Sequence, residues 1–123
     1  KAEKKLLGTL IKYKIRLICL AGFMKILSKK FILKFEGKIL NIHPSLLPNY
    51  KGLNTHRRVI ENKEKFTGCT VHLVNTRLDS GKIILQKKIK ILRKDNENSL
   101  TKKVLKLEHQ LYPRAIVKFL SSR

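Results

Sequence analysis

The amino-acid sequence predicts an α/β protein, a largely parallel open sheet with helices on both of its faces. Two observations lead to this prediction. Short apolar or alternating segments typical of strands take turns with longer segments of helical periodicity. The segments between them contain the glycine, proline and serine typical of loops, and the chain shows no internal repeat or linker. We therefore expect one domain over residues 1–123, with a core of its own.

The first half of the chain is expected to contain two helices and two strands. Residues 4–13 place leucine and isoleucine at helical spacing with lysines opposite, which predicts an amphipathic helix. Residues 15–21 are a short apolar run, suited to a strand covered on both faces. A loop at 22–27 leads to a helix that Ser28 caps and that ends before Gly37. Residues 38–43 then alternate as a strand.

The second half begins with a loop at residues 44–52 that is long enough to cover a pocket. The remaining predicted elements are a helix at 55–65 capped by Thr55 and closed by Gly68, a strand at 69–74, a turn at 78–81, a strand at 82–92, a polar turn at 95–99 and a helix at 99–120. Within that last helix, Pro113 is expected to cause a kink or to divide it in two.

The chain is strongly basic, with 29 Lys and Arg against 8 Asp and Glu and a net charge of +21. Such a charge attracts phosphates, nucleic acid or anionic membranes. The basic residues are scattered along the whole chain, which favours a compositional bias on solvated faces over a nucleic-acid patch. No apolar run approaches the length of a membrane span. We therefore expect neither nucleic acid nor a membrane as the partner.

Chemical motifs of several enzyme classes are missing from the sequence. It contains no HExxH motif, Cys/His cluster, GxSxG motif or glycine-rich phosphate loop, so we expect no metal and no nucleophilic hydrolysis. Cys19 and Cys69 have no ligand spacing and are expected to be reduced, structural thiols in a cytoplasmic protein.

A polar pair is expected at the end of the strand at 38–43. Because side chains alternate along a strand, Asn41 and His43 emerge on one face while Leu40 and Ile42 point to the other. Pro44 has no N–H to continue a ladder, so the strand ends where the pair emerges. Open α/β sheets bind their ligands at the carboxyl ends of strands. On these residues alone, a purely structural role for His43 remains open.

Asp79 is one of two aspartates in the chain and sits at a turn after a strand. A carboxylate near an imidazole holds the orientation of the ring and prepares it to act as an acid. The spacing does not decide whether Asp79 meets His43, because proximity in an open sheet depends on strand order. His72 alternates with hydrophobic neighbours and is expected to be structural.

Six blocks of the sequence resemble the glycinamide ribonucleotide transformylase family, in the family's order and at its spacing. The blocks cover the chain from about Ile15 to its end and read LAGFMKIL, NIHPSLLP, GLNTHR, GCTVH, LDSG and EHQLYP. The resemblance implies transfer of a formyl group from 10-formyltetrahydrofolate to the amine of glycinamide ribonucleotide in purine biosynthesis. It also implies the Rossmann-like formyltransferase fold.

The resemblance further implies roles for individual residues. Asn41 would donate a hydrogen bond to the formyl oxygen as it becomes an oxyanion, which makes it a contact of the formyl donor as well. Protonated His43 would stabilise the same intermediate and protonate the leaving folate nitrogen, and Asp79 would fix His43 and relay protons through water. Glu108 would hold the amine end of the substrate. The backbone expected to bind the pterin side of the folate comprises Met24, Lys25, Ile26 and Leu27.

The chain also departs from the family pattern. Lys25 stands where the family usually has arginine, and Lys51 and Lys82 stand where it commonly has proline. The family's first strand and its phosphate-binding loop have no counterpart, so we expect the N-terminal portion to be missing. We accordingly expect the chain alone to be weakly active or inactive. The exposed sheet edge favours association, for example as a homodimer.

Two alternative functions remain open. Methionyl-tRNA formyltransferase shares a similar Asn-x-His core and would account for the positive charge. The GLNTHR block and the lack of a following RNA-binding domain argue against it. The other alternative is a catalytically dead, basic nucleic-acid-binding remnant, which predicts salt-sensitive binding to RNA or DNA and no dependence on His43.

Overall fold

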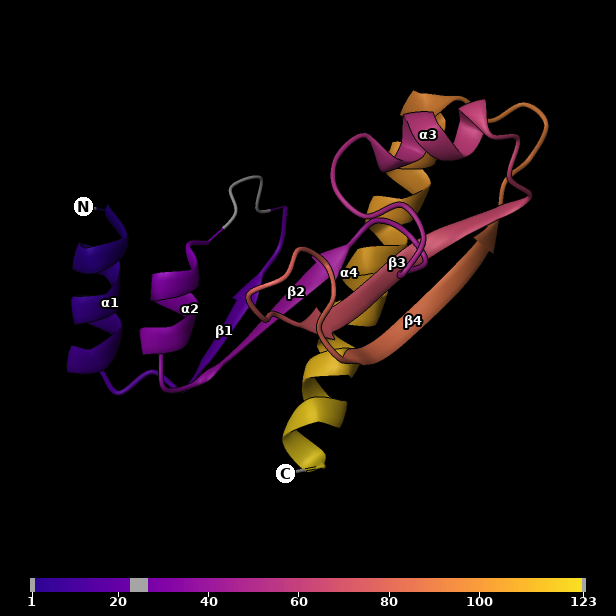
Figure 1. Cartoon of the computed structure of the whole chain (residues 1–123). Helices are drawn as coiled ribbons and strands as arrows, with labels where there is room; N and C mark the ends of the chain where they lie inside the picture. The colour runs from indigo at the N-terminus through magenta and orange to yellow at the C-terminus, as the bar shows by residue number, and fades with distance from the viewer. Residues whose placement is uncertain (1, 23–26, 123) are drawn as a thin grey trace.

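In a computed structural model that describes residues 2–22 and 27–122, the chain forms one open sheet with helices packed around it (Figure 1). The strands occur in the order β1-β2-β3-β4 across the sheet. The elements are α1 (Ala2–Lys12), β1 (Leu17–Leu20), α2 (Lys29–Lys34), β2 (Lys38–His43), α3 (Thr55–Glu61), β3 (Phe66–Leu73), β4 (Ile83–Lys90) and α4 (Glu97–Ser121).

The sheet is mixed, which corrects the expectation of a largely parallel one. Strands β1 and β2 are parallel, whereas β2 with β3 and β3 with β4 are antiparallel. A short loop joins β3 to β4, and such loops connect antiparallel neighbours because a parallel connection needs a crossover of a dozen or more residues. The segment after β2 runs past α3 to the far end of β3, so β3 returns in the opposite direction (Figure 1). The predicted α/β class with an open sheet is confirmed.

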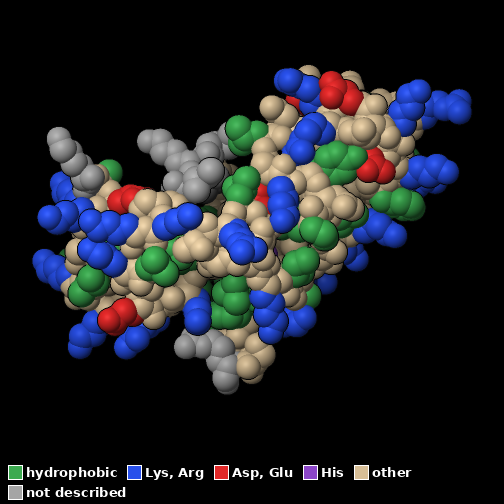
Figure 2. Space-filling view, viewed as in Figure 1, with side chains coloured by type: hydrophobic (Ala, Val, Ile, Leu, Met, Phe, Trp, Pro, Cys, Tyr) green, Lys and Arg blue, Asp and Glu red, His purple; other side chains and the backbone are tan. Residues whose placement is uncertain are grey.

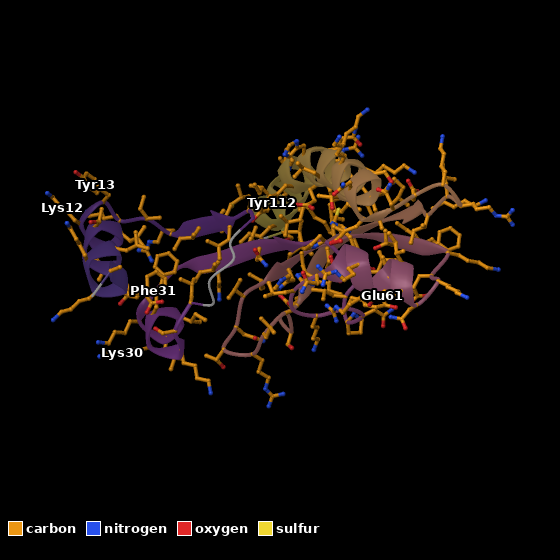
Figure 3. All side chains as sticks on the ribbon, turned by 90° about the horizontal axis from the view of Figure 1, so that it is seen from above. Lys12, Tyr13, Lys30, Phe31, Glu61 and Tyr112 are labelled. Carbon is orange, nitrogen blue, oxygen red and sulfur yellow. The ribbon has the colours of Figure 1, made fainter. Side chains whose placement is uncertain are left out.

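Helices cover both faces of the sheet, as the sequence predicted. On one face, Leu40 and Ile42 of β2 pack into a core with residues of α4. On the other face, Ile39 packs with Leu7 of α1 and Phe31 of α2. Seen from above, α2 and α4 lie on opposite sides of the sheet (Figure 3). The pleat of β2 thus separates two hydrophobic clusters.

The helix ends follow local capping chemistry in two places. The Ser28 side chain accepts a hydrogen bond from the Phe31 backbone N–H, so the predicted cap of α2 is confirmed. At α4, Asn96 and Ser99 form a capping box, and the helix begins at Glu97 inside the segment predicted as a turn. Its two reciprocal bonds satisfy backbone donors that the start of a helix leaves free.

The cap expected for α3 is wrong, and the last helix is not divided at Pro113. Asn54, in a left-handed conformation, precedes α3 and makes no side-chain cap bond, so Thr55 is not the cap. Helix α4 runs as one 25-residue element with Pro113 inside it. Proline removes one backbone bond, and the buried face around it, which includes Leu111 and Ala115, supplies packing that keeps the helix continuous.

The surface agrees with the scattered basic residues of the sequence. Lysine and arginine side chains are spread over the whole face seen in Figure 2, from α1 to α3. Within residues 2–22 and 27–122, no helix is long and apolar enough to cross a membrane.

Candidate active site

A loop at residues 44–54, which we call the strap, follows β2 and is bonded to the same face of the sheet as His43. The Thr70 hydroxyl on β3 donates to the Ser45 carbonyl over 2.7 Å and accepts from the Leu47 N–H over 3.1 Å. Thr70 is the cross-strand neighbour of His43. Because Ser45 and Thr70 are fully buried, these bonds hold the start of the strap without competition from water.

Gly68 explains how the strap comes so close to the sheet. A Cβ atom at this position would lie 2.8 Å from the Leu46 side chain and 1.9 Å from the Lys87 carbonyl oxygen. Only a residue without a side chain fits here. The predicted role of Gly68, closing a helix, is therefore wrong, since it lies within β3.

His43 is buried at the end of β2 with both ring nitrogens facing oxygen atoms. Its Nε2 lies 2.8 Å from the Tyr50 carbonyl oxygen, and its Nδ1 lies 3.5 Å from Asp79 Oδ2. Carbonyl and carboxylate oxygens only accept hydrogen bonds, so Nε2 donates to the Tyr50 carbonyl, and Nδ1 faces the Asp79 carboxylate. The ring is thus held between two acceptor groups.

Asp79 joins the strap to the loop between β3 and β4. One oxygen, Oδ2, accepts a 2.8 Å hydrogen bond from the Gly52 N–H and faces His43, while Oδ1 lies 3.8 Å from His72 Nε2. The Asp79 side chain is 8% exposed, and its φ of 48° is a left-handed conformation that aspartate tolerates better than most residues. The structure thus brings together Asp79 and His43, whose proximity the spacing left open.

Asn41 is oriented by His72, its cross-strand neighbour on β3. His72 Nδ1 lies 2.9 Å from the Leu73 carbonyl oxygen and must donate to it, which leaves Nε2 to accept from Asn41 Nδ2 at 3.4 Å. Burial lowers the pKa of His72, while the Leu73 carbonyl and Asp79 oppose that shift. A neutral His72 therefore orients the amide nitrogen of Asn41 toward its Nε2, and the second amide hydrogen makes no hydrogen bond to the residues that the structure describes.

His72 is the site residue whose role the sequence interpretation missed. We expected it to be structural, and its alternation with hydrophobic residues did place it correctly in a strand. The available signal is its position in the alternation of β3. Residues 70 and 72 lie on the same face of β3 and are the cross-strand neighbours of His43 and Asn41. Recognising this signal required the antiparallel register of β2 and β3, which a single sequence does not supply.

Glu108 lies apart from this group, on the α4 side of β2. It lines a cavity of about 590 Å³ together with Cys19, Ile42 and Tyr112. Burial raises the pKa of Glu108 to about 7. Ile42 points away from Asn41 and His43, so the structure places Glu108 and the Asn41–His43–Asp79 group on opposite faces of the strand. A single bound molecule can contact both regions only if it extends past the carboxyl end of β2.

The segment predicted to bind the folate is only partly described. Met24, Lys25 and Ile26 lie outside the described residues, and Leu27 packs against the cluster formed by α1 and α2. Among the residues the structure describes, no group of three His, Cys, Asp or Glu side chains could hold a metal ion. Cys19 and Cys69 are both free.

The fold and this polar group agree with one known class of transferase domain. The sequence profile described as Formyl transferase matches residues 1–116 of the chain. The chain therefore belongs to the formyl transferase family.

Comparison with individual proteins narrows the relationship. The chain is 42% identical over 121 residues to the phosphoribosylglycinamide formyltransferase of Escherichia coli, covering 98% of the chain and 57% of that protein. It is 48% identical over 103 residues to the trifunctional purine biosynthetic protein adenosine-3 of Drosophila melanogaster, covering 84% of the chain and 8% of that protein. The crystal structure of glycinamide ribonucleotide transformylase 1 from Symbiobacterium toebii superposes with a TM-score of 0.92 at 40% identity, over 98% of this chain and 57% of that one. The chain thus spans little more than half of these bacterial proteins.

Proposed function

We propose that this chain carries the formyl-transfer centre of a phosphoribosylglycinamide formyltransferase. The donor is 10-formyltetrahydrofolate, and the acceptor is the amine of glycinamide ribonucleotide. The observation that carries the proposal is the group at the end of β2, where His43 Nδ1 lies 3.5 Å from Asp79 Oδ2 and Asn41 is the next residue on the same face. The names of the relatives support this choice of substrate.

The chemistry follows from what these side chains can donate. The substrate amine attacks the formyl carbon, a carbon–nitrogen bond forms, and the formyl oxygen takes the negative charge. Asn41 donates to this oxygen with the amide hydrogen that His72 leaves free, a contribution that grows as charge develops. When the bond to the folate nitrogen breaks, protonated His43 gives that nitrogen the proton of Nδ1, because Nε2 is hydrogen-bonded to the Tyr50 carbonyl. The amine loses a proton in turn, and Asp79 helps to return it to His43 through water.

Substrate binding is assigned to two further places. The backbone of Met24–Leu27 is proposed to bind the pterin side of the folate. Glu108 is proposed to hold the amine end of the substrate from the cavity between β1 and α4. We place the enzyme in the cytoplasm, as a protein of small-molecule metabolism, and propose a homodimer as its state in solution.

Replacing the central imidazole tests this assignment. Formyl transfer to glycinamide ribonucleotide is measured for the chain and for His43→Ala, each alone and with a separately supplied N-terminal portion of a relative. We expect His43→Ala to lower kcat/KM by about 10³-fold, because it removes both the proton donor and the charge beside the oxyanion. The control is Lys87→Ala, an exposed change on β4 that leaves activity unaltered.

The same assay separates the alternatives. Activity that depends on His43 supports the proposal whether or not the N-terminal portion is needed. Transfer to methionyl-tRNA in place of glycinamide ribonucleotide would move the assignment to the tRNA enzyme. Equal activity of the wild-type chain and His43→Ala would refute the role of this site.

A further inference from the structure

Gln86 on β4 is bonded to the strap although it lies far from it in the sequence. It is the cross-strand neighbour of Thr70. The Gln86 amide nitrogen donates over 2.8 Å to the Leu47 carbonyl and over 2.9 Å to the Thr70 hydroxyl oxygen. Both hydrogens of the amide are therefore used by these two acceptors, which leaves the group one fixed orientation.

The hydrogen bonds of Gln86 complete a junction that centres on the Thr70 hydroxyl. This hydroxyl donates to the Ser45 carbonyl and accepts from the Leu47 N–H and from Gln86. A hydroxyl has one hydrogen and two lone pairs, so the three bonds satisfy it fully. The Leu47 N–H and the Leu47 carbonyl are thus both tied to the sheet, and losing Gln86 frees that carbonyl.

From this junction, bonded contacts continue to His43. The single hydrogen of the Ser45 hydroxyl is shared between the Asn49 carbonyl, at 2.6 Å from Oγ, and the Tyr50 carbonyl, at 3.2 Å. The Tyr50 carbonyl is the acceptor for His43 Nε2 at 2.8 Å. The position of the acceptor that fixes the His43 ring is therefore set by the strap that Gln86 holds.

We propose that Gln86 is a positioning residue for His43. Its side chain is hydrogen-bonded to the strap and to Thr70, and it acts by fixing the strap whose Tyr50 carbonyl accepts the hydrogen bond of His43 Nε2. The effect on catalysis rests on the function proposed above, whereas the effect on the ring is a property of the chain alone. The two can be measured separately.

The test compares Gln86→Glu with Lys90→Gln in the 123-residue chain. Glutamate keeps the shape of glutamine and removes both donors, so it faces two acceptors with no hydrogen to give. Lys90 lies on the same strand as Gln86, four residues further along, and therefore on the same face. It is exposed, and among the described residues it makes no hydrogen bond to the strap. Both changes lower the net charge by one unit, so an effect of the net charge of the chain would be the same in both, and the uncharged Gln86→Met controls for a local effect of the new carboxylate.

The direct measurement is the ring N–H signal of His43 in ¹⁵N-labelled protein. We expect a slowly exchanging Nε2 proton in the wild type and in Lys90→Gln, and its loss in Gln86→Glu. In the formyl-transfer assay, we expect kcat of Gln86→Glu to fall about tenfold with KM within about twofold, because a displaced acid affects the chemical step more than binding.

An unchanged His43 signal in Gln86→Glu would overturn the proposal, even if activity fell. A lost signal together with no measurable formyl transfer, even when the N-terminal portion of a relative is supplied, would support the positioning role and count against the proposed function instead. Gln86 is exposed, so its replacement removes no core packing, and circular dichroism verifies the fold. If Gln86→Glu does not fold, Gln86→Met, which is uncharged and also lacks the donor, gives the same two readouts.

Discussion

The two faces of β2 differ in composition although they belong to one six-residue strand. Leu40 and Ile42 are 0% and 4% exposed in the core formed with α4. Asn41 and His43 point the other way, to His72, Asp79 and the strap. From Leu40 to His43, the pleat therefore lets a single strand contribute to stability through alternate residues and to chemistry through the residues between them. Substitutions on the apolar face should therefore change mainly the free energy of unfolding, and substitutions of Asn41 or His43 should change mainly kcat/KM.

The largest effect is expected on the polar face. Asn41→Ala removes the donor to the developing oxyanion and should lower kcat/KM by about 10²- to 10³-fold. The free energy of unfolding should change by less than about 1 kcal/mol, because the Asn41 side chain makes one long hydrogen bond to His72. Steady-state kinetics and urea unfolding measure the two quantities. The control is Asn98→Ala, an exposed change on α4. Equal kcat/KM values for the two variants would show that the polar face of β2 does not act in catalysis through Asn41.

On the apolar face, the expected change is one of stability. Leu40→Ala leaves a cavity in the core and should lower the free energy of unfolding by about 3 kcal/mol. The folded fraction should keep its kcat, since Leu40 points away from His43. The matched control is Leu33→Ala on α2, where the leucine is 77% exposed and its loss should be nearly neutral. A fall in kcat of the folded variant would show that the two faces are coupled.

The smallest effect concerns pH and the acid on the α4 side. Burial raises the pKa of Glu108 from its ordinary value of 4.5 to about 7, so between these values the folded chain keeps a proton that the unfolded chain has lost. The contribution of Glu108 to stability should therefore fall as pH rises from about 4.5 to about 7 and then level off. Glu108→Gln stays neutral and should be more stable than wild type at pH 8 by on the order of 1 kcal/mol, discounted for partial exposure.

Unfolding curves recorded at several pH values test this expectation. Glu61→Gln, an exposed change on α3, should keep the decline seen in the wild type. A decline that persists in Glu108→Gln would show that another group on the molecule produces it.

Local patterns predicted the elements of the fold better than their directions. The alternation of residues 38–43 gave β2 with its observed bounds, and Ser28 marked the start of α2. These features depend on neighbouring residues only. The antiparallel return of β3 depends on where the chain travels between residues 44 and 65, and side-chain periodicity carries no sign of direction. This is why a parallel sheet was expected where a mixed one exists.

The same limit applies to the candidate site. Asn41 and His43 were predicted as a pair because they are two residues apart on one strand. His72 and Gln86 reach the site through the register of β2, β3 and β4, which no spacing along the chain encodes. Asp79 was selected because acidic residues are rare in the chain and because of the family resemblance. Its contact with the Gly52 N–H became visible only in three dimensions.

The bonds that hold the strap join residues distant in sequence, which has a consequence for the order of assembly. Ser45 and Thr70 are 25 residues apart, Gly52 and Asp79 are 27 apart, and Leu47 and Gln86 are 39 apart. Each contact must offset the entropy of closing a loop, so the strap can settle only after β3 and β4 have paired. We therefore expect the strap, and with it the partners of His43, to become ordered after the sheet. Amide hydrogens of Leu47 and Gly52 should exchange by an opening that costs less free energy than global unfolding.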